Sequence, residues 1–338
     1  MSFTSNLLYS AYYLKELDWK KASQYMEYVH RKQNRSKAAI SMDIVYDVFK
    51  YNIGIMDYFL FRFYELSPEE KETWAGTGFM YEYHKAMNPM ENRGILSNKI
   101  KFFQFYAPFV KHVYCTIDDL RADTGKFDKV LAATKKKIVV KDSNGQCGWG
   151  VEVLEVDKYS KESLYSYMKE KGFDLVESFV QQHSALNELS SSGLNTIRLI
   201  TEVGPNKEVR VLGGLLRVSI NSHVDNIAMG NIACEVDLQT GVLIGNGVYS
   251  DITKPEVENH PVTGKKLKGF KIPFWKEAIE MVKAAALYNT GNKSIGWDVA
   301  ITDNGPSLIE GNHNWCKLLW QLPVKKGLKS RILEGQKA

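Results

Sequence analysis

The segment 295–312 constrains this chain more than any other, because its pattern predicts a β-hairpin with acidic side chains on one face. On either side of the tetrapeptide Asp-Asn-Gly-Pro at 303–306, apolar and polar residues alternate, as they do in strands that bury one face. The tetrapeptide itself is a strong turn signal. If the turn is centred on Asn304, Asp298 lies directly opposite Glu310.

The strand period of two divides the side chains of this hairpin between two faces. Asp298, Glu310 and Asn312 share one face. The other face, which we expect to point toward a core, carries Trp297, Val299, Ile301 and Ile309. Two carboxylates that face each other across a ladder repel, and a Mg²⁺ ion with oxygen ligands from the first three residues would offset this repulsion. A β-bulge that shifts the register, or an Arg or Lys that neutralises the pair, is the alternative.

A glycine-rich loop joins two further strand signals. Residues 141–150 read KDSNGQCGWG, with Gly145, Gly148 and Gly150 spaced through the loop. Glycines let backbone N–H groups approach an anion closely, and Lys141 on the incoming strand adds a positive charge. The loop is not a P-loop, in which the lysine follows the glycines, and no helix follows it as in a dinucleotide fingerprint. A simple hairpin turn explains it equally well.

The other patterns predict an α+β chain with mostly antiparallel strands, since hairpin signals outnumber βαβ units. Residues 1 to about 90 read as helical, and Ser67 followed by Pro68 is typical of a helix start. Further helices are expected at 160–171 and 274–287. Strand signals occur at 138–140, 151–156, 174–180, 195–203, 208–219, 232–238 and 242–248.

Composition narrows the class of protein. The net charge of +5 is spread over 338 residues, which does not indicate nucleic-acid binding, and the basic run 135–137 is better explained as the solvated start of a strand. The four cysteines lie far apart, so neither a disulfide framework nor a zinc site is expected. There is no signal-peptide pattern and no apolar run long enough to span a bilayer. We therefore expect a cytoplasmic protein, and no oligomeric state is indicated.

Several segments between about residues 95 and 320 occur in the order seen in one enzyme superfamily. Besides the glycine loop and the Asp…Glu-x-Asn hairpin, they are Leu175–Val180, Gln182-His183, Asn195–Thr201, Val224-Asp225-Asn226, Leu238–Gly241 and Gly296-Trp297-Asp298. Together they resemble the ATP-grasp enzymes and, more narrowly, their sugar-transfer-associated subfamily.

The resemblance implies the ATP-grasp fold, in which two α+β subdomains clamp ATP, preceded by a helical N-terminal region. It divides the chain into the helical region at 1–93 and an N-terminal subdomain with the glycine loop at 94–173. A C-terminal subdomain with the Mg²⁺ site would occupy 174–325, and a tail 326–338. The implied cofactors are ATP and Mg²⁺.

The resemblance also implies roles for single residues. Lys99 and Lys141 match the two phosphate-contacting lysines, although Asn98 stands where the family usually has Asp. The adenine edge would be Glu177, Ser178, Phe179 and Val180. Gln182 and His183 stand near the place of the expected ribose-binding carboxylate. Gly145, Gly148 and Gly150 would cover the phosphates, and Asp298, Glu310 and Asn312 would hold Mg²⁺.

Arg198 and Arg217 are the candidates for stabilising negative charge that develops during the reaction. Arg198 lies in a strand of apolar neighbours, where a charge is usually paired, so a structural ion pair is the alternative for both arginines. Asp225 and Asn226 would close an acceptor pocket, and an Asx turn explains them equally well.

If the family reaction applies, a carboxylate takes the γ-phosphate of ATP and the resulting acyl-phosphate reacts with an amine to give an amide. The resemblance suggests a small-molecule or sugar-linked carboxylate and an amino acid or other amine, in surface polysaccharide assembly. No Ser-His-Asp or Cys-His arrangement competes with this reading. The alternatives are an ATP-grasp kinase acting on a sugar or polyol hydroxyl, and a non-catalytic nucleotide-binding module.

Overall fold

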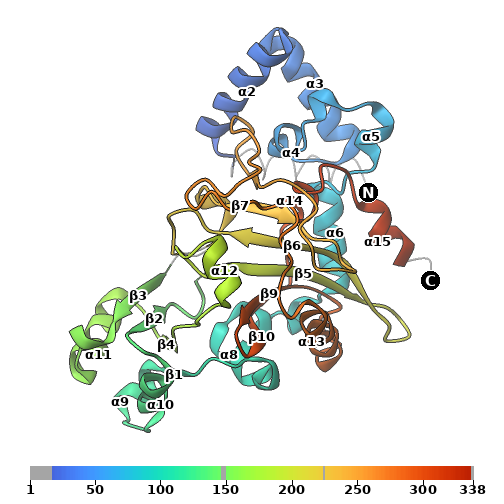
Figure 1. Ribbon diagram of the computed structural model, residues 1–338. Helices are drawn as coiled ribbons and strands as arrows, with labels where there is room; N and C mark the ends of the chain where they lie inside the picture. Colours follow the sequence, from blue (N-terminus) through green and yellow to red (C-terminus); the bar gives the residue numbers. More distant parts are fainter. Residues whose placement is uncertain (1–16, 146–149, 224, 336–338) are drawn as a thin grey trace.

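The strands of this protein form two antiparallel sheets, as a computed structural model of residues 17–145, 150–223 and 225–335 shows (Figure 1). The smaller sheet has the order β1-β4-β2-β3 and the larger one β10-β9-β5-β6-β7-β8. All strand pairs in these ranges are antiparallel, as predicted. The strands are β1 (Tyr114–Thr116), β2 (Lys137–Lys141), β3 (Val151–Glu155), β4 (Leu175–Ser178), β5 (Thr196–Val203), β6 (Val209–Val218), β7 (Ile232–Glu235), β8 (Val248–Tyr249), β9 (Ser294–Thr302) and β10 (Gly305–Asn312).

Seven of the fourteen α-helices in the described ranges lie before residue 106 and seven follow it, which confirms the predicted α+β class with a helical N-terminal region. The helix start predicted at Ser67 is confirmed as well. The hydroxyl of Ser67 accepts a hydrogen bond from the Glu70 N–H at the start of α5, and Gly172 ends α11 in the left-handed conformation. The helices are α2 (Trp19–Gln33), α3 (Lys37–Tyr51), α4 (Ile55–Leu60), α5 (Pro68–Glu72), α6 (Thr77–Met87), α7 (Gly94–Ser97), α8 (Lys99–Phe105), α9 (Ile117–Arg121), α10 (Lys126–Ala133), α11 (Lys161–Lys171), α12 (Ser184–Leu189), α13 (Trp275–Tyr288), α14 (Lys317–Gln321) and α15 (Lys329–Gly335).

The six-stranded sheet is the centre of the molecule, with helices on both faces. On one face, α8 and α13 cover a large apolar core that contains Trp297 and Val299. On the other face, Ile200 and Leu212 pack with side chains of α6, α14 and α15, including Trp320. Because both faces are covered, all eight residues of β5 are buried, and a polar side chain there must find its partner within the protein.

The four-stranded sheet packs against α9, α10 and α11 and has a core of its own. The alternation in β2 buries Ile138 and Val140 in this core. The opposite side of the strand carries Lys137, Val139 and Lys141, and these three side chains point away from the helices, toward the larger sheet.

The hairpin of β9 and β10 has the predicted pairing at its carboxylates and a β-bulge before them. Asp298 is the partner of Glu310, as expected from the sequence, but Leu308 pairs with Val299, so Ile309 is an extra residue in β10. The bulge places Leu308 in the core and turns Ile309 toward the side of Glu310. The expectation that Ile309 faces the core is therefore wrong, because an unbroken ladder was assumed.

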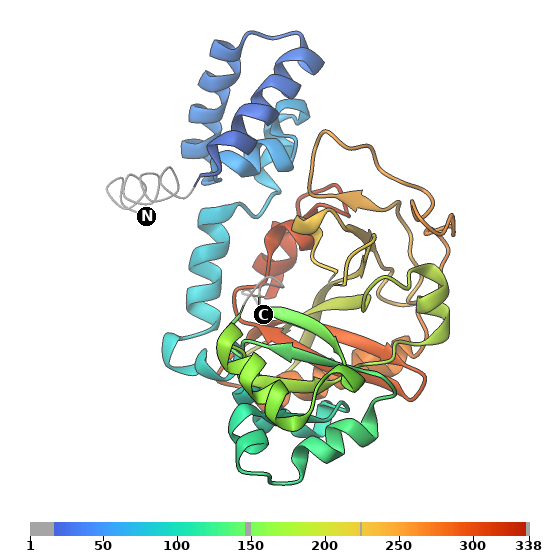
Figure 2. The same cartoon turned by 90° about the vertical axis from the view of Figure 1, so that its left-hand side faces the viewer.

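Helices α2 to α5 form a unit that projects from the body of the molecule (Figure 2). It has a separate aromatic core that includes Tyr25, Phe59 and Phe63. The hydroxyl of Tyr25 donates a 3.1 Å hydrogen bond to the carbonyl oxygen of Ser250, which joins the unit to the segment after β8. Helix α6 then leads from this unit along the larger sheet. The domain boundaries given above remain a prediction.

None of the helices within the described residues has the length and apolar character that crossing a membrane requires.

Candidate active site

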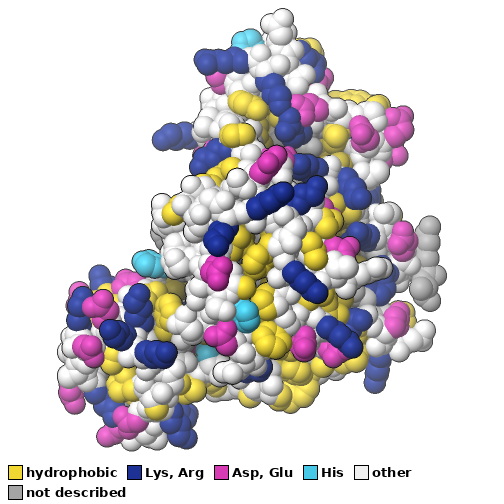
Figure 3. Space-filling view, viewed as in Figure 1, with side chains coloured by type: hydrophobic (Ala, Val, Ile, Leu, Met, Phe, Trp, Pro, Cys, Tyr) yellow, Lys and Arg dark blue, Asp and Glu magenta, His cyan; other side chains and the backbone are white. Residues whose placement is uncertain are grey.

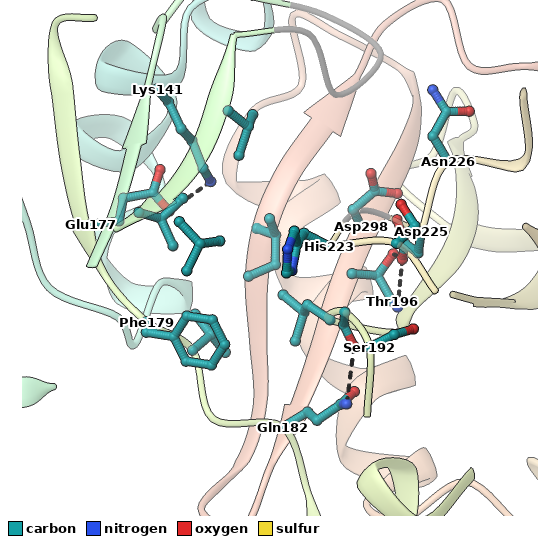
Figure 4. A pocket seen from close by; sticks show the side chains of 18 of the residues that line it. Lys141, Glu177, Phe179, Gln182, Ser192, Thr196, His223, Asp225, Asn226 and Asp298 are labelled. Carbon is teal, nitrogen blue, oxygen red and sulfur yellow. Dashed lines mark hydrogen bonds and ion pairs between the residues drawn. The ribbon is translucent and has the colours of Figure 1, made fainter. Parts of the chain in front are cut away.

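A cavity of about 690 Å³ lies between the two sheets (Figure 4). The smaller sheet supplies one wall from β2, β3 and β4. The larger sheet supplies the other from β5, β6, β9 and β10, and two loops complete it. In Figure 4, Lys141, Glu177 and Phe179 face Asp298 and Asp225 across the space. The predicted site residues that line it are Lys99, Lys141, Gly145, Glu177, Ser178, Phe179, Val180, Arg217, Asp298 and Glu310.

On the smaller-sheet wall, Lys141 forms an ion pair with Glu177. Its Nζ lies 2.8 Å from Glu177 Oε2, because β2 and β4 are neighbours. His112 Nε2 is 3.4 Å from the same oxygen, and burial lowers the pKa of His112, which favours the neutral ring. Among the atoms that the structure describes, Glu177 Oε1 has no hydrogen-bond partner. The wall thus presents one paired lysine and one buried carboxylate oxygen still able to accept a hydrogen bond.

Lys99 stands at the start of α8 and holds the beginning of the glycine loop. Its Nζ donates to the carbonyl oxygens of Asp142 and Gly145, and burial lowers the pKa of the amine. The Asn98 amide donates to Ser143 Oγ at 2.9 Å. Asn98 therefore ties the helix to the loop, although it is not the aspartate that the family usually has.

The glycine loop is described only in part. Gly145 lines the cavity. Gly150, with a φ of +69°, follows the turn and lies outside the lining. The predicted phosphate-covering residue Gly148 falls outside the described residues.

On the larger-sheet wall, Asp298 is held by two arginines. Arg198 donates from Nε to Asp298 Oδ1 at 2.5 Å and from Nη2 to Oδ2 at 3.1 Å. Arg217 Nη2 lies 2.8 Å from the same Oδ2. Burial raises the pKa of Asp298, but the two guanidinium groups outweigh this effect and keep the pKa well below its usual range. Arg198 is buried behind Asp298, whereas Arg217 also lines the cavity.

Glycine at position 296 makes room for this arrangement. A Cβ atom there would lie 2.5 Å from Trp315 Cβ and 3.3 Å from the Cδ of Arg198. Any side chain would displace one of them, so Gly296 permits the close approach of Arg198 to Asp298 across β5 and β9.

Asp225 extends the charged cluster. Its Oδ2 accepts hydrogen bonds from the Thr196 N–H and hydroxyl at 2.7 Å and 2.6 Å, and its Oδ1 lies 3.2 Å from Arg217 Nη2. Next to it, Asn226 accepts a hydrogen bond from the Ala228 N–H, as in an Asx turn. Asp225 and Asn226 both line the cavity as well, so these contacts agree with both readings of the pair.

Glu310 and Asn312 lie beside this cluster. Burial and the neighbouring Asp298 carboxylate raise the pKa of Glu310. The Asn312 amide donates to Glu310 Oε1 at 3.3 Å, so the two predicted ligands are adjacent. The expected repulsion between Asp298 and Glu310 is therefore present. The two arginines neutralise Asp298, but the pKa of Glu310 stays raised.

The donor set fits a hard divalent cation. The cluster holds three carboxylates, Asp225, Asp298 and Glu310, beside the two guanidinium groups, and Lys99 is a further positive charge near Glu310. Carboxylate and amide oxygens suit Mg²⁺, which keeps several waters and takes further ligands from phosphates. No group of three or more His, Cys, Asp and Glu side chains forms a metal cage within the described ranges. A cation would thus depend on Asp298, Glu310, Asn312 and oxygens from outside the chain.

His183, like Gly150 and Asn312, is a predicted site residue that does not line the cavity. It precedes α12, where its Nδ1 accepts a 3.1 Å hydrogen bond from the Ala185 N–H. Gln182 does line the cavity, and its amide also donates to the carbonyl oxygen of Ser190 at 2.9 Å.

Sequence reasoning missed several residues of the cavity wall. Lys137 lines the cavity, with its Nζ 5.8 Å from the centre of the Phe179 ring. The alternation of Lys137, Val139 and Lys141 could have revealed it, because all three share one face of β2. Nothing in the local pattern marks the polar lining residues of α12 and of the two loops, which are Asn187 in α12 and Ser191, Ser192, Asn221, Ser222 and His223 in the loops.

The family of the chain follows from its sequence. A family model described as sugar-transfer associated ATP-grasp matches residues 79–337, and the chain belongs to this family. The resemblance drawn from the motifs is thereby confirmed, and with it the predicted ATP-grasp fold class. None of the curated protein sequences matches the chain significantly.

Several solved structures are similar to this chain at low identity. The ATP-grasp ligase PsnB, complexed with a precursor variant, Mg and ADP, has 10% identity over 77% of this chain and 66% of its own, with a TM-score of 0.42. For N5-carboxyaminoimidazole synthetase from Staphylococcus aureus, complexed with ADP, the values are 11%, 71%, 52% and 0.43. For L-amino acid ligase from Bacillus licheniformis they are 13%, 72%, 48% and 0.39. The chain spans about half to two thirds of the length of these proteins.

Proposed function

We propose that this protein is an ATP- and Mg²⁺-dependent ligase that joins a carboxylate to an amine through an acyl-phosphate. One observation carries the proposal. Lysines on one wall of a single cavity face a buried cluster of arginines and carboxylates on the other. Such an array suits phosphoryl transfer, in which catalysis is mostly positioning and charge neutralisation. Membership of the ATP-grasp family supports ATP as the nucleotide.

In this proposal the smaller-sheet wall binds the nucleotide. Phe179 and Val180 contact the base, and the free Oε1 of Glu177 accepts a hydrogen bond at the inner end of the cavity. Lys99 and Lys141 neutralise phosphate oxygens. To do so, Lys141 exchanges its contact with Glu177 for one with phosphate.

The larger-sheet wall handles the reacting groups. Asp298, Glu310 and Asn312 would hold Mg²⁺, which when bound supplies further charge neutralisation. Arg217 lines the cavity and stabilises negative charge on the transferring group, and Arg198 positions Asp298 from behind. A carboxylate oxygen of the substrate attacks the γ-phosphorus as its bond to ADP breaks. The amine then attacks the carbonyl carbon, loses a proton and expels phosphate.

For the substrate we propose a sugar acid or sugar-linked carboxylate and an amino acid or other amine, in surface polysaccharide synthesis. Support comes from the description of the family as sugar-transfer associated. Polar side chains of α12 and of the two loops also line the cavity with hydroxyl and amide groups, which suit a ligand with many hydroxyl groups; they are Asn187, Ser191, Ser192, Asn221, Ser222 and Asn226.

The test is ADP release from ATP and Mg²⁺ with pools of uronic acids and amino acids, with and without hydroxylamine as a trap. A ligase needs both a carboxylate and an amine, and hydroxylamine converts its acyl-phosphate into a hydroxamate. ADP release that yields a stable phosphate ester and no hydroxamate would identify a kinase instead. ATP binding without turnover for any pair in the pools would contradict the proposed substrates.

A further inference from the structure

Helix α3 is apolar on two opposite faces. Its inner face buries Ile40 and Ile44 in the core of the N-terminal unit. Its outer face is also mostly apolar and lies in solvent, although the outer face of a surface helix is normally polar. This exposed stripe consists of Ala38, Ser41, Met42 (68% exposed), Val45 (57%), Tyr46 (59%) and Phe49 (46%).

The stripe is continuous and lacks charge along its length. In α3, which the structure describes in full, the exposed charged residues are Lys37 and Lys50, one at each end. Asp43 pairs with Arg35 at 2.6 Å, and Asp47 is buried against Lys71. Figure 3 shows hydrophobic side chains on the surface of the N-terminal helices. Contiguous exposed apolar surface of this kind marks an interaction site.

The side chains of the stripe become larger along the helix. The small residues Ala38 and Ser41 lie at the start of the stripe. The large residues Tyr46 and Phe49 lie at its end, with the same spacing of three residues. If two copies of α3 pack antiparallel, Ala38 faces Phe49, Ser41 faces Tyr46, and Met42 faces Val45. Each small residue then meets a large one, twice in a two-fold symmetric pair. Parallel packing would set the large rings against each other.

The two ends of the stripe also differ in net charge: its start is basic and its end is acidic. Near the start of α3 lie Arg31 at the end of α2, Arg35 in the turn and Lys37 in the first turn of α3, with Glu27 and Asp43 as their partners. At its end lies α5, held there by the 2.7 Å ion pair between Lys71 and Asp47. Helix α5 exposes Glu69, Glu70 and Glu72, which outnumber the exposed Lys50 at this end of α3. In an antiparallel pair the basic end of each copy lies beside the acidic end of the other.

We propose that the outer face of α3 binds a second copy of this chain, with the two α3 helices antiparallel about a two-fold axis near Met42 and Val45. The complementarity of size and that of charge select the same orientation independently. A helix of 15 residues is about 22 Å long, so the interface is small and the dimer dissociates at low concentration. The cavity lies outside this interface, so each copy keeps a complete site.

The first experiment measures the mass of the full-length protein by sedimentation equilibrium over about a hundredfold range of concentration. Wild type should form dimers, and Val45→Glu should raise the dimer dissociation constant about a hundredfold, because a carboxylate is buried at the axis. Met90→Glu is the matched control, since Met90 is 80% exposed outside the stripe. An unchanged melting temperature would show that each variant folds. A monomer throughout, or a dimer that Val45→Glu leaves intact, overturns the proposal.

Charge reversal tests the orientation. Arg31→Glu and Glu69→Lys should each weaken the dimer about tenfold, and the two together in one chain should restore it. A double variant as weak as the single ones would contradict the antiparallel arrangement. Likewise, in a chain with Cys147→Ser and Cys316→Ser, a mixture of Ala38→Cys and Phe49→Cys proteins should cross-link, and neither protein should do so alone. Cross-linking of Ala38→Cys with itself would indicate parallel packing.

A lipid surface is the competing occupant of the stripe, and vesicles distinguish it. Wild type is mixed with vesicles of phosphatidylglycerol and phosphatidylcholine and sedimented. We expect the protein to stay in solution. Sedimentation that Val45→Glu abolishes, from a protein that is monomeric in solution, overturns the dimer and assigns the stripe to a membrane.

Discussion

Lys141, on the smaller-sheet wall of the cavity, has one carboxylate partner, whereas Asp298, on the larger-sheet wall, is held by two arginines. The first is a single pair at the cavity surface. The second belongs to a buried network in which Asp225 and Glu310 also take part. Moving Lys141 from Glu177 to a phosphate breaks one ion pair, whereas moving one member of the buried network leaves several charges without a partner. One wall is therefore suited to bind and release a ligand, and the other to hold a fixed geometry.

The largest effect we expect is that of Glu310→Ala, which removes a proposed Mg²⁺ ligand from the fixed wall. Turnover should fall by about 10³-fold or more, and Mg²⁺ should no longer strengthen ATP binding in calorimetry. The fold should persist, because Asp298 loses a repelling neighbour. Glu188→Ala at an exposed carboxylate (72% for the side chain) is the control. Wild-type turnover in Glu310→Ala would remove the metal assignment.

Arg198→Met tests whether the larger-sheet wall is a structural network. Asp298 would keep Arg217 alone, so the free energy of unfolding should fall by about 3–5 kcal/mol. Urea denaturation measures this change. Lys265→Met, which breaks the exposed pair with Glu188, should cost less than about 1 kcal/mol. Equal losses in the two variants would show that the Arg198 pair is no more structural than a surface pair.

Lys141→Ala tests the exchangeable wall. We expect ATP affinity to fall about 10–100-fold, which corresponds to the loss of one or two charge-assisted hydrogen bonds. The stability loss should be smaller than for Arg198→Met, since Glu177 keeps His112 as a neighbour. Lys136→Ala, at an exposed position just before β2, is the control. Unchanged affinity, measured by calorimetry, would mean that the glycine loop is only a turn.

The pH profile of kcat/KM should have an acidic limb set by Glu310 and an alkaline limb set by Lys99. The pKa of Glu310 is raised, so this carboxyl stays protonated to a higher pH than an ordinary glutamate and activity is lost earlier on acidification. The pKa of Lys99 is lowered, so its charge is lost at a lower pH than for an ordinary lysine. The active range should therefore be narrow on both sides. Lys99→Arg should extend only the alkaline limb, and a profile that shifts as a whole would contradict this assignment.

The hairpin was predictable because its information is local. The turn at 303–306 and the alternation around it set Asp298 opposite Glu310, and Lys141 followed from its place before a glycine loop. The partners of these residues were not predictable. Arg198 meets Asp298 because β5 and β9 are neighbours, although the two residues lie 100 positions apart in the chain.

The direction of two side chains depends on how distant segments pack. Lys137 is the exposed first residue of β2, as expected from the sequence, and it also lines the cavity because the alternation of β2 extends back to it. The ring of His183 caps α12, and its contact with the nucleotide stays a prediction. Although the alternation puts Lys137 on the same face as Lys141, neither its contact with the cavity nor the cap at His183 is visible in the local sequence pattern alone.

Ile309, the bulged residue of β10, contributes to the size of the cavity but not to its charge. Because Leu308 pairs with Val299 and Glu310 pairs with the preceding residue, Asp298, a chain without Ile309 would form an uninterrupted ladder. Both pairs would survive, with Leu308 in the core and Glu310 in the cavity. Deletion of this residue would thus widen the cavity by one apolar side chain while preserving its carboxylates. A site built in this way can adapt to a ligand of another size without rebuilding its chemistry.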